Sequence, residues 1–230
     1  MTRVAIVTGA SSGIGRATAA LLEAQGVAVA VFDANADDPV DVSDPGAVAR
    51  AVERVHHQLG AVDILVNAAG ITAGGPLGSD GYVESWERAL AVNLTGAMHT
   101  VRACLDDLVR SDAGRIVNVA STEALTAGRF GGPYTVSKHG LLGFTRSLAV
   151  ELGRQGVTAN CVCPGATLTG MTEVIPEADR DTYARRSIPV GRYGRPEEVA
   201  YMIVALTAPE ASFVNGAVIT VDGGMSASSP

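Results

Sequence analysis

Tyr134 and Lys138 lie four residues apart in the segment YTVSK, directly after Gly131-Gly132-Pro133. Residues at positions i and i+4 share one face of a helix, so the ammonium can lie beside the phenol. An unperturbed tyrosine has a pKa near 10, and a base near neutrality needs a pKa about three lower, a change of roughly 4 kcal/mol. A positive charge nearby acts in that direction. An isolated Tyr/Lys pair is more often a solvated helix face, so the rest of the sequence has to decide.

Ser121 supplies a third polar group that could act with this pair. It closes the apolar run RIVNVAS, and twelve residues separate it from Tyr134. A hydroxyl at the end of a strand can hydrogen-bond both a substrate oxygen and the phenol, which fixes the two relative to each other. Ser121, Tyr134 and Lys138 are therefore candidate residues for general acid–base catalysis.

A glycine-rich segment, TGASSGIG at 8–15, follows a predicted strand and opens a predicted helix. Glycines there let the backbone turn sharply and approach a pyrophosphate, which sits on the N–H groups of the helix terminus. A purely structural turn is the alternative for such a segment taken alone. The residues expected to hold the phosphates are Gly9, Ser11, Ser12, Gly13, Ile14 and Gly15.

Asp33 lies at the end of the next predicted strand, at the distance where an acid meets a ribose 2′-hydroxyl. A carboxylate there repels the 2′-phosphate of NADP, and no arginine follows at Ala34 or Asn35. NAD is therefore favoured over NADP. The positive charge of an oxidised nicotinamide would add to that of Lys138 in lowering the tyrosine pKa, so the constellation suits hydride transfer.

Composition agrees with a globular α/β protein that handles a small molecule. The 230 residues are 47% hydrophobic but only 4% aromatic, which suits strands buried on both faces of a parallel sheet. The formal charge is −7 without a basic cluster, which argues against nucleic acid and anionic membranes as partners. Cys161 and Cys163 fit neither a disulfide framework nor metal-ligand spacing, and we expect no metal site. No signal peptide or membrane-spanning run is recognised, and we expect a reducing, cytoplasmic setting.

Short β-branched runs alternate with longer amphipathic ones, which predicts a single α/β domain over 1–230 with a Rossmann-type, doubly wound parallel sheet of about seven strands. Caps predict helices that start at Asp44-Pro45 and at Pro196, and a long helix over Ser79–Arg110. The predicted strands are Val4–Thr8, Ala28–Asp33, Ile64–Asn67, Arg115–Ala120, Thr158–Cys163 and Val218–Val221, with a stub at Pro39–Val42.

The interval between Phe32 and Val40 is too short for an ordinary crossover. A connection between parallel strands needs a dozen residues or more, usually a helix. The crossover helix between the second and third strands is therefore expected to be missing or reduced to a loop.

Six motifs together resemble the short-chain dehydrogenase/reductase family, in its single-domain NAD(P)-dependent branch. That branch includes members of the 3-oxoacyl-carrier-protein reductase type and of the hydroxysteroid and dihydrodiol dehydrogenase types. The resemblance implies that Ser121, Tyr134 and Lys138 are the catalytic triad, and that Asn93 is a fourth member holding a water that relays protons. The alternative for Asn93 is a helix kink. The motifs are TGASSGIG at 8–15, NAAG at 67–70, VNLTG at 92–96, S-x12-YTVSK at 121–138, PGATLT at 164–169 and VDGG at 221–224.

The resemblance also implies further cofactor contacts. One pair would flank the adenine, the NAAG motif would lie on the adenosine ribose side, and two later segments would meet the nicotinamide and the phosphates; Lys138 and Tyr134 would face the nicotinamide ribose. Asn67 could instead brace its strand, and Pro164-Gly165 could be a turn. These positions are Asp41, Val42, Asn67, Ala68, Ala69, Gly70, Pro164, Gly165, Thr167 and Thr169.

The substrate is expected to be a small secondary alcohol or ketone, with a cyclic or hydroxyacyl molecule as possibilities. It would meet Ser121 and Tyr134, while the segment near 169–188 would close as a lid, with Met171 facing an apolar substrate. Glu123 could hydrogen-bond a second hydroxyl, or it could be a solvated loop carboxylate. Related enzymes use two long helices in a four-helix contact, so a homotetramer is implied. A catalytically silent NAD-binding sensor or scaffold is the alternative function.

Overall fold

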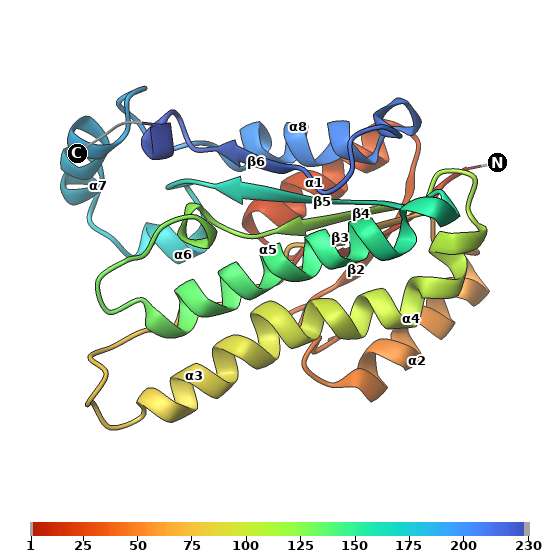
Figure 1. Cartoon of the computed structure of the whole chain (residues 1–230), viewed down its shortest axis with the longest axis horizontal. Helices are drawn as coiled ribbons and strands as arrows, with labels where there is room; N and C mark the ends of the chain where they lie inside the picture. Colours follow the sequence, from red (N-terminus) through yellow and green to blue (C-terminus); the bar gives the residue numbers. More distant parts are fainter. Residues whose placement is uncertain (1, 228–230) are drawn as a thin grey trace.

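The computed structural model describes residues 2–227 and contains one parallel β-sheet (Figure 1). Within those residues the sheet has six strands, in the order β2-β1-β3-β4-β5-β6. The order reverses between β1 and β3, as expected of a doubly wound sheet whose crevice lies at the carboxyl ends of the strands. The strands are β1 Val4–Thr8, β2 Ala28–Phe32, β3 Ile64–Asn67, β4 Arg115–Val119, β5 Thr158–Pro164 and β6 Val218–Val221.

Helices cover both faces of the sheet. α1 and α8 pack on one face and α2, α4 and α5 on the other, while α6 and α7 lie at the end toward which the β5 arrow points in Figure 1. The helices are α1 Gly13–Ala24, α2 Pro45–Gln58, α3 Tyr82–Leu90, α4 Gly96–Arg110, α5 Gly132–Leu152, α6 Gly170–Glu173, α7 Glu177–Ser187 and α8 Pro196–Thr207.

Alternation along each strand explains the two layers. In β1, Val4 and Ile6 face the core under α2, α4 and α5, whereas Ala5 and Val7 face the core under α1 and α8. Successive side chains point to opposite faces of a sheet, so a strand covered on both sides must be apolar throughout. The predicted Rossmann-type α/β fold is confirmed.

The two helix starts predicted from caps are also confirmed. The Asp44 side chain accepts a hydrogen bond of 2.7 Å from the Gly46 N–H, and Pro45 is the first residue of α2. Pro196 likewise opens α8. Carboxylates at an N-cap satisfy backbone donors that have no partner within the helix, and proline loses nothing at the first position.

The expectation of about seven strands is wrong by one strand. Residues 33–44 form a loop without a helix, as predicted, but Pro39–Val42 pairs with no strand among residues 2–227. The Val40 N–H bonds the Asp33 carbonyl at 3.0 Å, and the Val40 side chain is buried in the core under α2. A loop this short folds the segment down onto the helical layer, so β2 remains the edge of the sheet.

The long helix predicted over Ser79–Arg110 begins later and contains a wider turn. Residues 77–81 form turns and a bend, α3 starts at Tyr82, and Ala91–Thr95 forms a π-helical turn that joins α3 to α4. There the Gly96 N–H donates to the carbonyl of Ala91, five residues earlier. π turns of this kind are found frequently at functional sites.

A buried carboxylate, Asp107 of α4, ties two helices and a loop together at the amino-terminal edge of the sheet. It lies 2.6 Å from His56 Nε2 and accepts bonds from the Val62 N–H at 3.1 Å and from Arg110 at 3.0 Å. A surface or packing role without a partner is expected of His56 from sequence, and this contact corrects it. Burial raises the Asp107 pKa, but these hydrogen bonds outweigh burial and leave the pKa below its ordinary value.

Replacing Asp107 with Asn is expected to destabilise the protein at pH 7 by about 3 kcal/mol, because a buried ionic hydrogen-bond network loses its charge. Since the folded pKa is lowered, the stabilisation is complete above the unfolded value of about 3.9 and is lost as pH falls through the folded value. Urea unfolding at pH 7 and near pH 3 measures both effects. Asp106→Asn, one residue away and exposed, is the control. Equal unfolding midpoints for the two variants at pH 7 would contradict this role.

A search of residues 2–227 finds no helix with the length and apolarity needed to cross a membrane.

Candidate active site

Three glycines of the first turn hold the backbone in a form that side chains would block. Gly9 has φ +68°, and a Cβ on it would lie 2.7 Å from Ala69 Cα. A Cβ on Gly15 would lie 2.2 Å from the Gly9 carbonyl oxygen. Gly13, with φ +51°, faces the Thr169 side chain. The turn is thus pressed between the end of β3 and the start of α6, which leaves its backbone open to a phosphate on the α1 terminus.

Asp33 lies just beyond β2 and is 8% exposed. Its Oδ2 accepts a hydrogen bond of 3.0 Å from the Ser11 N–H, and its Oδ1 accepts one of 2.8 Å from the Asn35 N–H. The carboxylate therefore connects the phosphate turn to the loop after β2. Each oxygen keeps further acceptor capacity for a ribose hydroxyl.

The NAAG motif is fixed by polar side chains from neighbouring elements. Thr8 Oγ1 accepts from the Ala68 and Ala69 N–H groups at 3.0 and 2.9 Å. The amide of Asn67 donates to Asn118 at 2.9 Å and accepts from Thr100 at 2.7 Å. This amide bonds inside the protein, so Asn67 fits the alternative of a strand brace.

The remaining predicted cofactor residues lie around the same edge of the sheet. Val42 is buried and its Cγ2 would lie 2.6 Å from a Cβ on Gly96, whereas Asp41 is exposed and accepts two hydrogen bonds from Ser43. Pro164 ends β5, and the Gly165 N–H continues the pairing with Val221 at 3.0 Å.

Two threonines continue from this strand end toward the phosphate turn. Thr167 donates to the Gly165 carbonyl at 3.0 Å, and Thr169 is the N-cap of α6. Since Thr169 also faces Gly13, the segment 164–169 reaches from the end of β5 to the phosphate turn. One ligand lying along the strand ends can touch both.

Tyr134 and Lys138 lie in the first turns of α5, as predicted from their spacing. Lys138 Nζ lies 5.6 Å from the centroid of the Tyr134 ring and donates to the Val119 carbonyl at 3.0 Å. Lys138 is only 4% exposed. A Cβ on Gly70 would lie 3.3 Å from Nζ, so the ammonium comes directly beside the end of the NAAG motif.

The pKa values of this pair differ from the sequence expectation. Burial raises the pKa of Tyr134, the nearby Ser121 hydroxyl partly offsets this, and the Glu123 charge adds to the increase. Burial lowers the pKa of Lys138 to about 8. In the protein without cofactor, burial changes both pKa values more than the two side chains change each other's. A low tyrosine pKa therefore requires a further positive charge in the site.

Ser121 and Glu123 begin a short 3-10 helix, Thr122–Ala124, after β4. Ser121 Oγ accepts from the Glu123 N–H at 3.1 Å, which leaves the hydroxyl proton free to be donated. Glu123 Oε2 accepts from Thr135 Oγ1 at 2.6 Å, so this carboxylate is tied to α5 and is not a free loop residue. Thr135 was missed from the sequence although it lies inside YTVSK, because its partner Glu123 is twelve residues away and only the fold brings the two together.

Asn93 lies in the π turn between α3 and α4 and is 1% exposed. Its Oδ1 accepts from the Ile71 N–H at 2.8 Å, and its Nδ2 donates to the Ile71 carbonyl and to Ser137 Oγ, each at 3.0 Å. The side chain thus holds the loop after β3 against α5, with Gly70 between Asn93 and Lys138. A helix kink alone does not account for these contacts.

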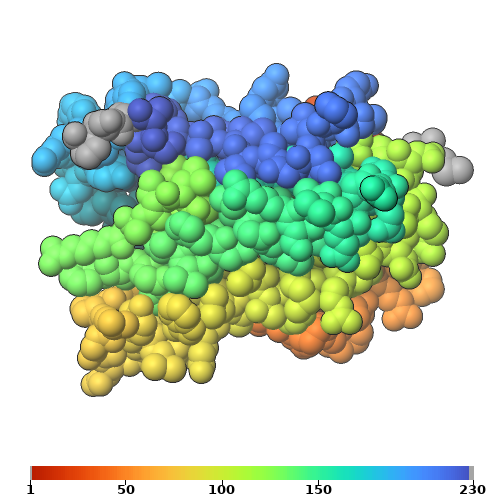
Figure 2. All heavy atoms as spheres, in the orientation of Figure 1, coloured from red at the N-terminus to blue at the C-terminus, as the bar shows by residue number. Residues whose placement is uncertain are grey.

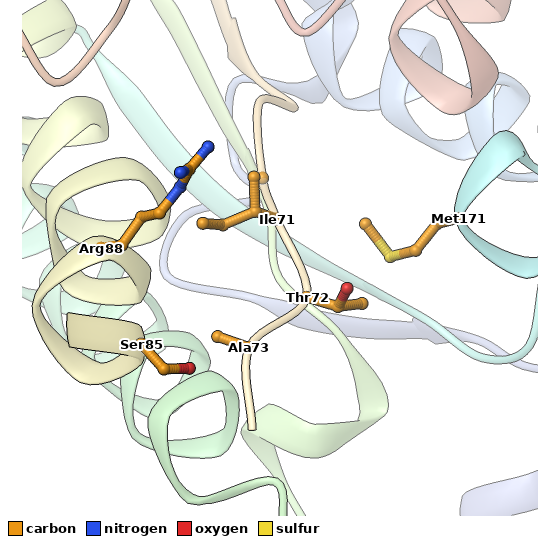
Figure 3. Close-up of a pocket in the computed structure, with 7 residues that line it drawn as sticks. Ile71, Thr72, Ala73, Ser85, Arg88 and Met171 are labelled. Carbon is orange, nitrogen blue, oxygen red and sulfur yellow. The ribbon is translucent and has the colours of Figure 1, made fainter. Parts of the chain in front are cut away.

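A cavity of about 430 Å³ extends from Gly70 over the loop after β3 (Figure 3). Met171 of α6 lies on one side of that loop and Arg88 of α3 on the other. Met171 is 43% exposed, which leaves room for α6 to move. Arg88 is absent from the sequence predictions because nothing in the sequence distinguishes it from other helix-surface arginines. The lining residues are Gly70, Ile71, Thr72, Ala73, Ser85, Arg88 and Met171.

These residues fit a dinucleotide. The backbone of the glycine turn is open to a phosphate because it leaves no space for a Cβ. Asp33 lies next to this turn, where a ribose would reach it, and Lys138 lies further along the strand ends, beside Gly70. No group of three or more His, Cys, Asp or Glu that could hold a metal ion occurs within residues 2–227.

Comparison with known proteins places this site in an enzyme family. The family model described as enoyl-(acyl carrier protein) reductase matches residues 9–226. The 3-oxoacyl-(acyl-carrier-protein) reductase of Thermotoga maritima is 36% identical over 97% of both chains. The 2-dehydro-3-deoxy-L-rhamnonate dehydrogenase (NAD(+)) of a Sphingomonas strain is 37% identical over 96% of this chain and 94% of its own.

Solved structures agree in fold and connectivity. The aldohexose dehydrogenase of Thermoplasma acidophilum superposes with a TM-score of 0.93, at 32% identity, over 100% of this chain and 96% of its own. The relatives compared are oxidoreductases, which gives no support to a silent sensor or scaffold. The chain is an oxidoreductase of the short-chain dehydrogenase/reductase family and uses a nicotinamide dinucleotide as its cofactor.

Proposed function

We propose that the protein is an NAD-dependent dehydrogenase or reductase of a small secondary alcohol or ketone, with Tyr134 as the general acid/base. The observation that carries the proposal is the burial of Lys138 beside Tyr134, Gly70 and Asn93. Burying an ammonium without a carboxylate partner costs folding free energy. Ionisable groups kept in such an environment are concentrated at functional sites. The dinucleotide, when bound, supplies or accepts the hydride.

Each of the four predicted catalytic residues then has a defined role in the reaction. Tyr134 gives its phenolic proton to a carbonyl oxygen in reduction and takes it from the hydroxyl in oxidation. Ser121 donates its free proton to the same substrate oxygen and holds it near the phenol. Among residues 2–227 the Lys138 ammonium donates to one acceptor, the Val119 carbonyl, so its other N–H groups can donate to the nicotinamide ribose and to a proton-relaying water. Asn93 maintains the space for that water by holding Ile71 and Ser137 in position through its hydrogen bonds.

A screen of secondary alcohols with NAD at alkaline pH tests this function directly. Reduced nicotinamide is followed by absorbance, and Tyr134→Phe is the blank. Turnover by the wild-type chain with none by the variant is expected. Turnover that the variant retains in full would sink the assignment of Tyr134.

The preference for NAD rests on the charge of Asp33, which bonds the phosphate turn through Ser11 and leaves the ribose side of the site negative. The residues expected to line the dinucleotide are those of the predicted set, from Gly9 to Thr169. Asp41 is the weakest member, because its exposed carboxylate is occupied by Ser43. The ratio of kcat/KM for NAD and NADP measures this preference.

Glu123 is placed to select substrates that carry a second hydroxyl. One carboxylate oxygen, Oε2, accepts from Thr135, which is adjacent to Tyr134, and Oε1 faces Gly128 of the following loop. Met171 would close over the substrate as part of a lid at 169–188 on a single domain. Within that segment Ala184 and Ile188 are the buried apolar residues. A panel of mono-alcohols and vicinal diols tests Glu123: the diols should be favoured, and equal rates would remove the role.

We also propose a homotetramer. The surface from α3 to α4 and the surface of α5 lie on one face of the molecule (Figure 2), and both carry exposed apolar side chains. Val83, Val136 and Val150 are examples. Apolar side chains exposed on helical faces support a contact between subunits there. Sedimentation velocity at micromolar concentration should give a tetramer, and a monomer would contradict it.

A further inference from the structure

Arg88 brings an unexpected charge to the cavity beside the catalytic residues. It extends from α3 toward the loop of Ile71, and the other residues that line the cavity are uncharged (Figure 3). Gly70, which also lines the cavity, lies against Lys138 and Asn93. A molecule that occupies this cavity can therefore meet a guanidinium and also lie close to Lys138 of the proposed catalytic residues.

Within residues 2–227, the Arg88 side chain makes no hydrogen bond or ion pair, whereas its backbone carbonyl accepts from the Ala91 N–H. Partners are near in sequence, since Glu84 precedes it by one helical turn and Glu87 is its neighbour. The chain has 24 acidic and 17 basic residues, so carboxylates are abundant. Glu84 at i−4 is the favourable position for an ion pair on a helix. The guanidinium instead lies along the cavity and keeps its donors available.

A negative charge, that of Glu123, also lies near the catalytic residues. Its carboxylate accepts a hydrogen bond from Thr135, the residue next to Tyr134, which holds it at the Thr135 side of the site. An anionic substituent would be repelled at that side and attracted at the Arg88 side. These two charges favour a substrate that carries a negative group near Arg88 and a hydroxyl near Glu123.

We propose that Arg88 binds the carboxylate of the substrate, so that the enzyme acts on secondary hydroxy acids and the corresponding oxo acids. The planar guanidinium presents paired N–H donors that match a carboxylate in a bidentate pair. The carboxylate would lie at the Arg88 end of the cavity while the carbinol or carbonyl meets Ser121 and Tyr134. This inference rests on the proposed function and narrows its substrate class.

The test compares a panel of aliphatic and cyclic secondary hydroxy acids with the methyl ester of each acid, using NAD as oxidant. The wild-type chain should prefer acids to esters. Arg88→Gln should reduce the kcat/KM for the acids by about 10- to 100-fold and abolish that preference, because a charge-assisted pair is lost. Arg88→Lys keeps the charge without the fork and should be intermediate. Arg102→Gln on α4, also an exposed helix arginine, is the matched control.

The outcomes separate this inference from the proposed function. If the wild-type chain oxidises no secondary alcohol or hydroxy acid, the proposed function fails, and this inference fails with it. If it oxidises alcohols but treats acids and esters alike, only the carboxylate assignment is overturned. A third outcome, in which Arg88 binds the cofactor, is recognised by measuring NADH binding by fluorescence. Weaker NADH binding by Arg88→Gln, with the preference for acids intact, would assign Arg88 to a cofactor phosphate and overturn its role toward the substrate.

Discussion

Replacing Tyr134 with Phe is expected to reduce kcat by about a thousandfold, within the range that a positioned general acid/base contributes. The substitution removes one oxygen and leaves the ring that packs near Lys138, whose Nζ lies 5.6 Å from the ring centroid. The binding of NADH should fall far less than kcat, because Tyr134 is expected to meet only the nicotinamide ribose, and the contacts that fix the glycine turn and Asp33 do not include it. Steady-state rates and NADH fluorescence measure the two effects.

Tyr201→Phe is the control for the chemical change itself, since Tyr201 is an exposed residue of α8. It should keep the wild-type rate. A Tyr134→Phe variant that loses NADH binding along with turnover would indicate a damaged cofactor site, and one that keeps turnover would contradict the catalytic assignment.

The pH dependence follows from the same residues. Burial raises the pKa of Tyr134, so the phenolate fraction increases with pH throughout the neutral range and alcohol oxidation should increase with it. Carbonyl reduction should fall over the same range, because it consumes the protonated phenol. Lys138, with a pKa of about 8 from burial, loses its charge above that pH in the protein without cofactor. Saturating NAD should therefore shift the oxidation profile to lower pH, because the added positive charge favours the phenolate.

The arrangement of the sheet could be predicted because its signals are local. The strands β1, β3 and β6 are apolar runs bounded by glycines or polar residues, and their limits match the predicted ones. The Tyr134/Lys138 pair is equally local, since one helical turn separates the two residues. The missing crossover helix followed from chain length alone.

What could not be predicted depends on contacts between distant segments. Val40 is buried under α2, and its segment therefore does not form the expected edge strand. The sequence of this short polar loop does not show that Val40 would pack against a distant helix. The π turn at Asn93 reflects bonds to Ile71 and Ser137, which lie 22 and 44 residues away. The raised pKa of Tyr134 reflects burial, which a spacing argument does not measure. Arg88 can be identified only from the structure, which shows that its side chain lines the cavity and forms no ion pair with the nearby Glu84 or Glu87.

Replacing Asp33 with Asn is expected to raise the ratio of kcat/KM for NADP over NAD by about 100- to 1000-fold. A carboxylate and a phosphate about 4 Å apart repel by ~4 kcal/mol at an effective dielectric constant near 20, and screening in a partly open site reduces this. Asn removes the charge and keeps one side-chain oxygen for the Ser11 or Asn35 N–H group, so the phosphate turn should retain its shape. Activity with NAD should fall about tenfold, because the ribose loses a charge-assisted hydrogen bond.

Asp37→Asn separates the position of Asp33 from the general negative charge of its loop. Asp37 is exposed in the same 33–44 segment, and its charge is screened by solvent, so its replacement should change the ratio less than about threefold. Equal effects of the two variants would mean that a diffuse field, and not the contact at Asp33, sets the preference. A wild-type chain that favours NADP would overturn the argument at its start, since the carboxylate that bonds Ser11 would then have to face a phosphate without repelling it. The initial rates of the three proteins with both cofactors decide between these cases.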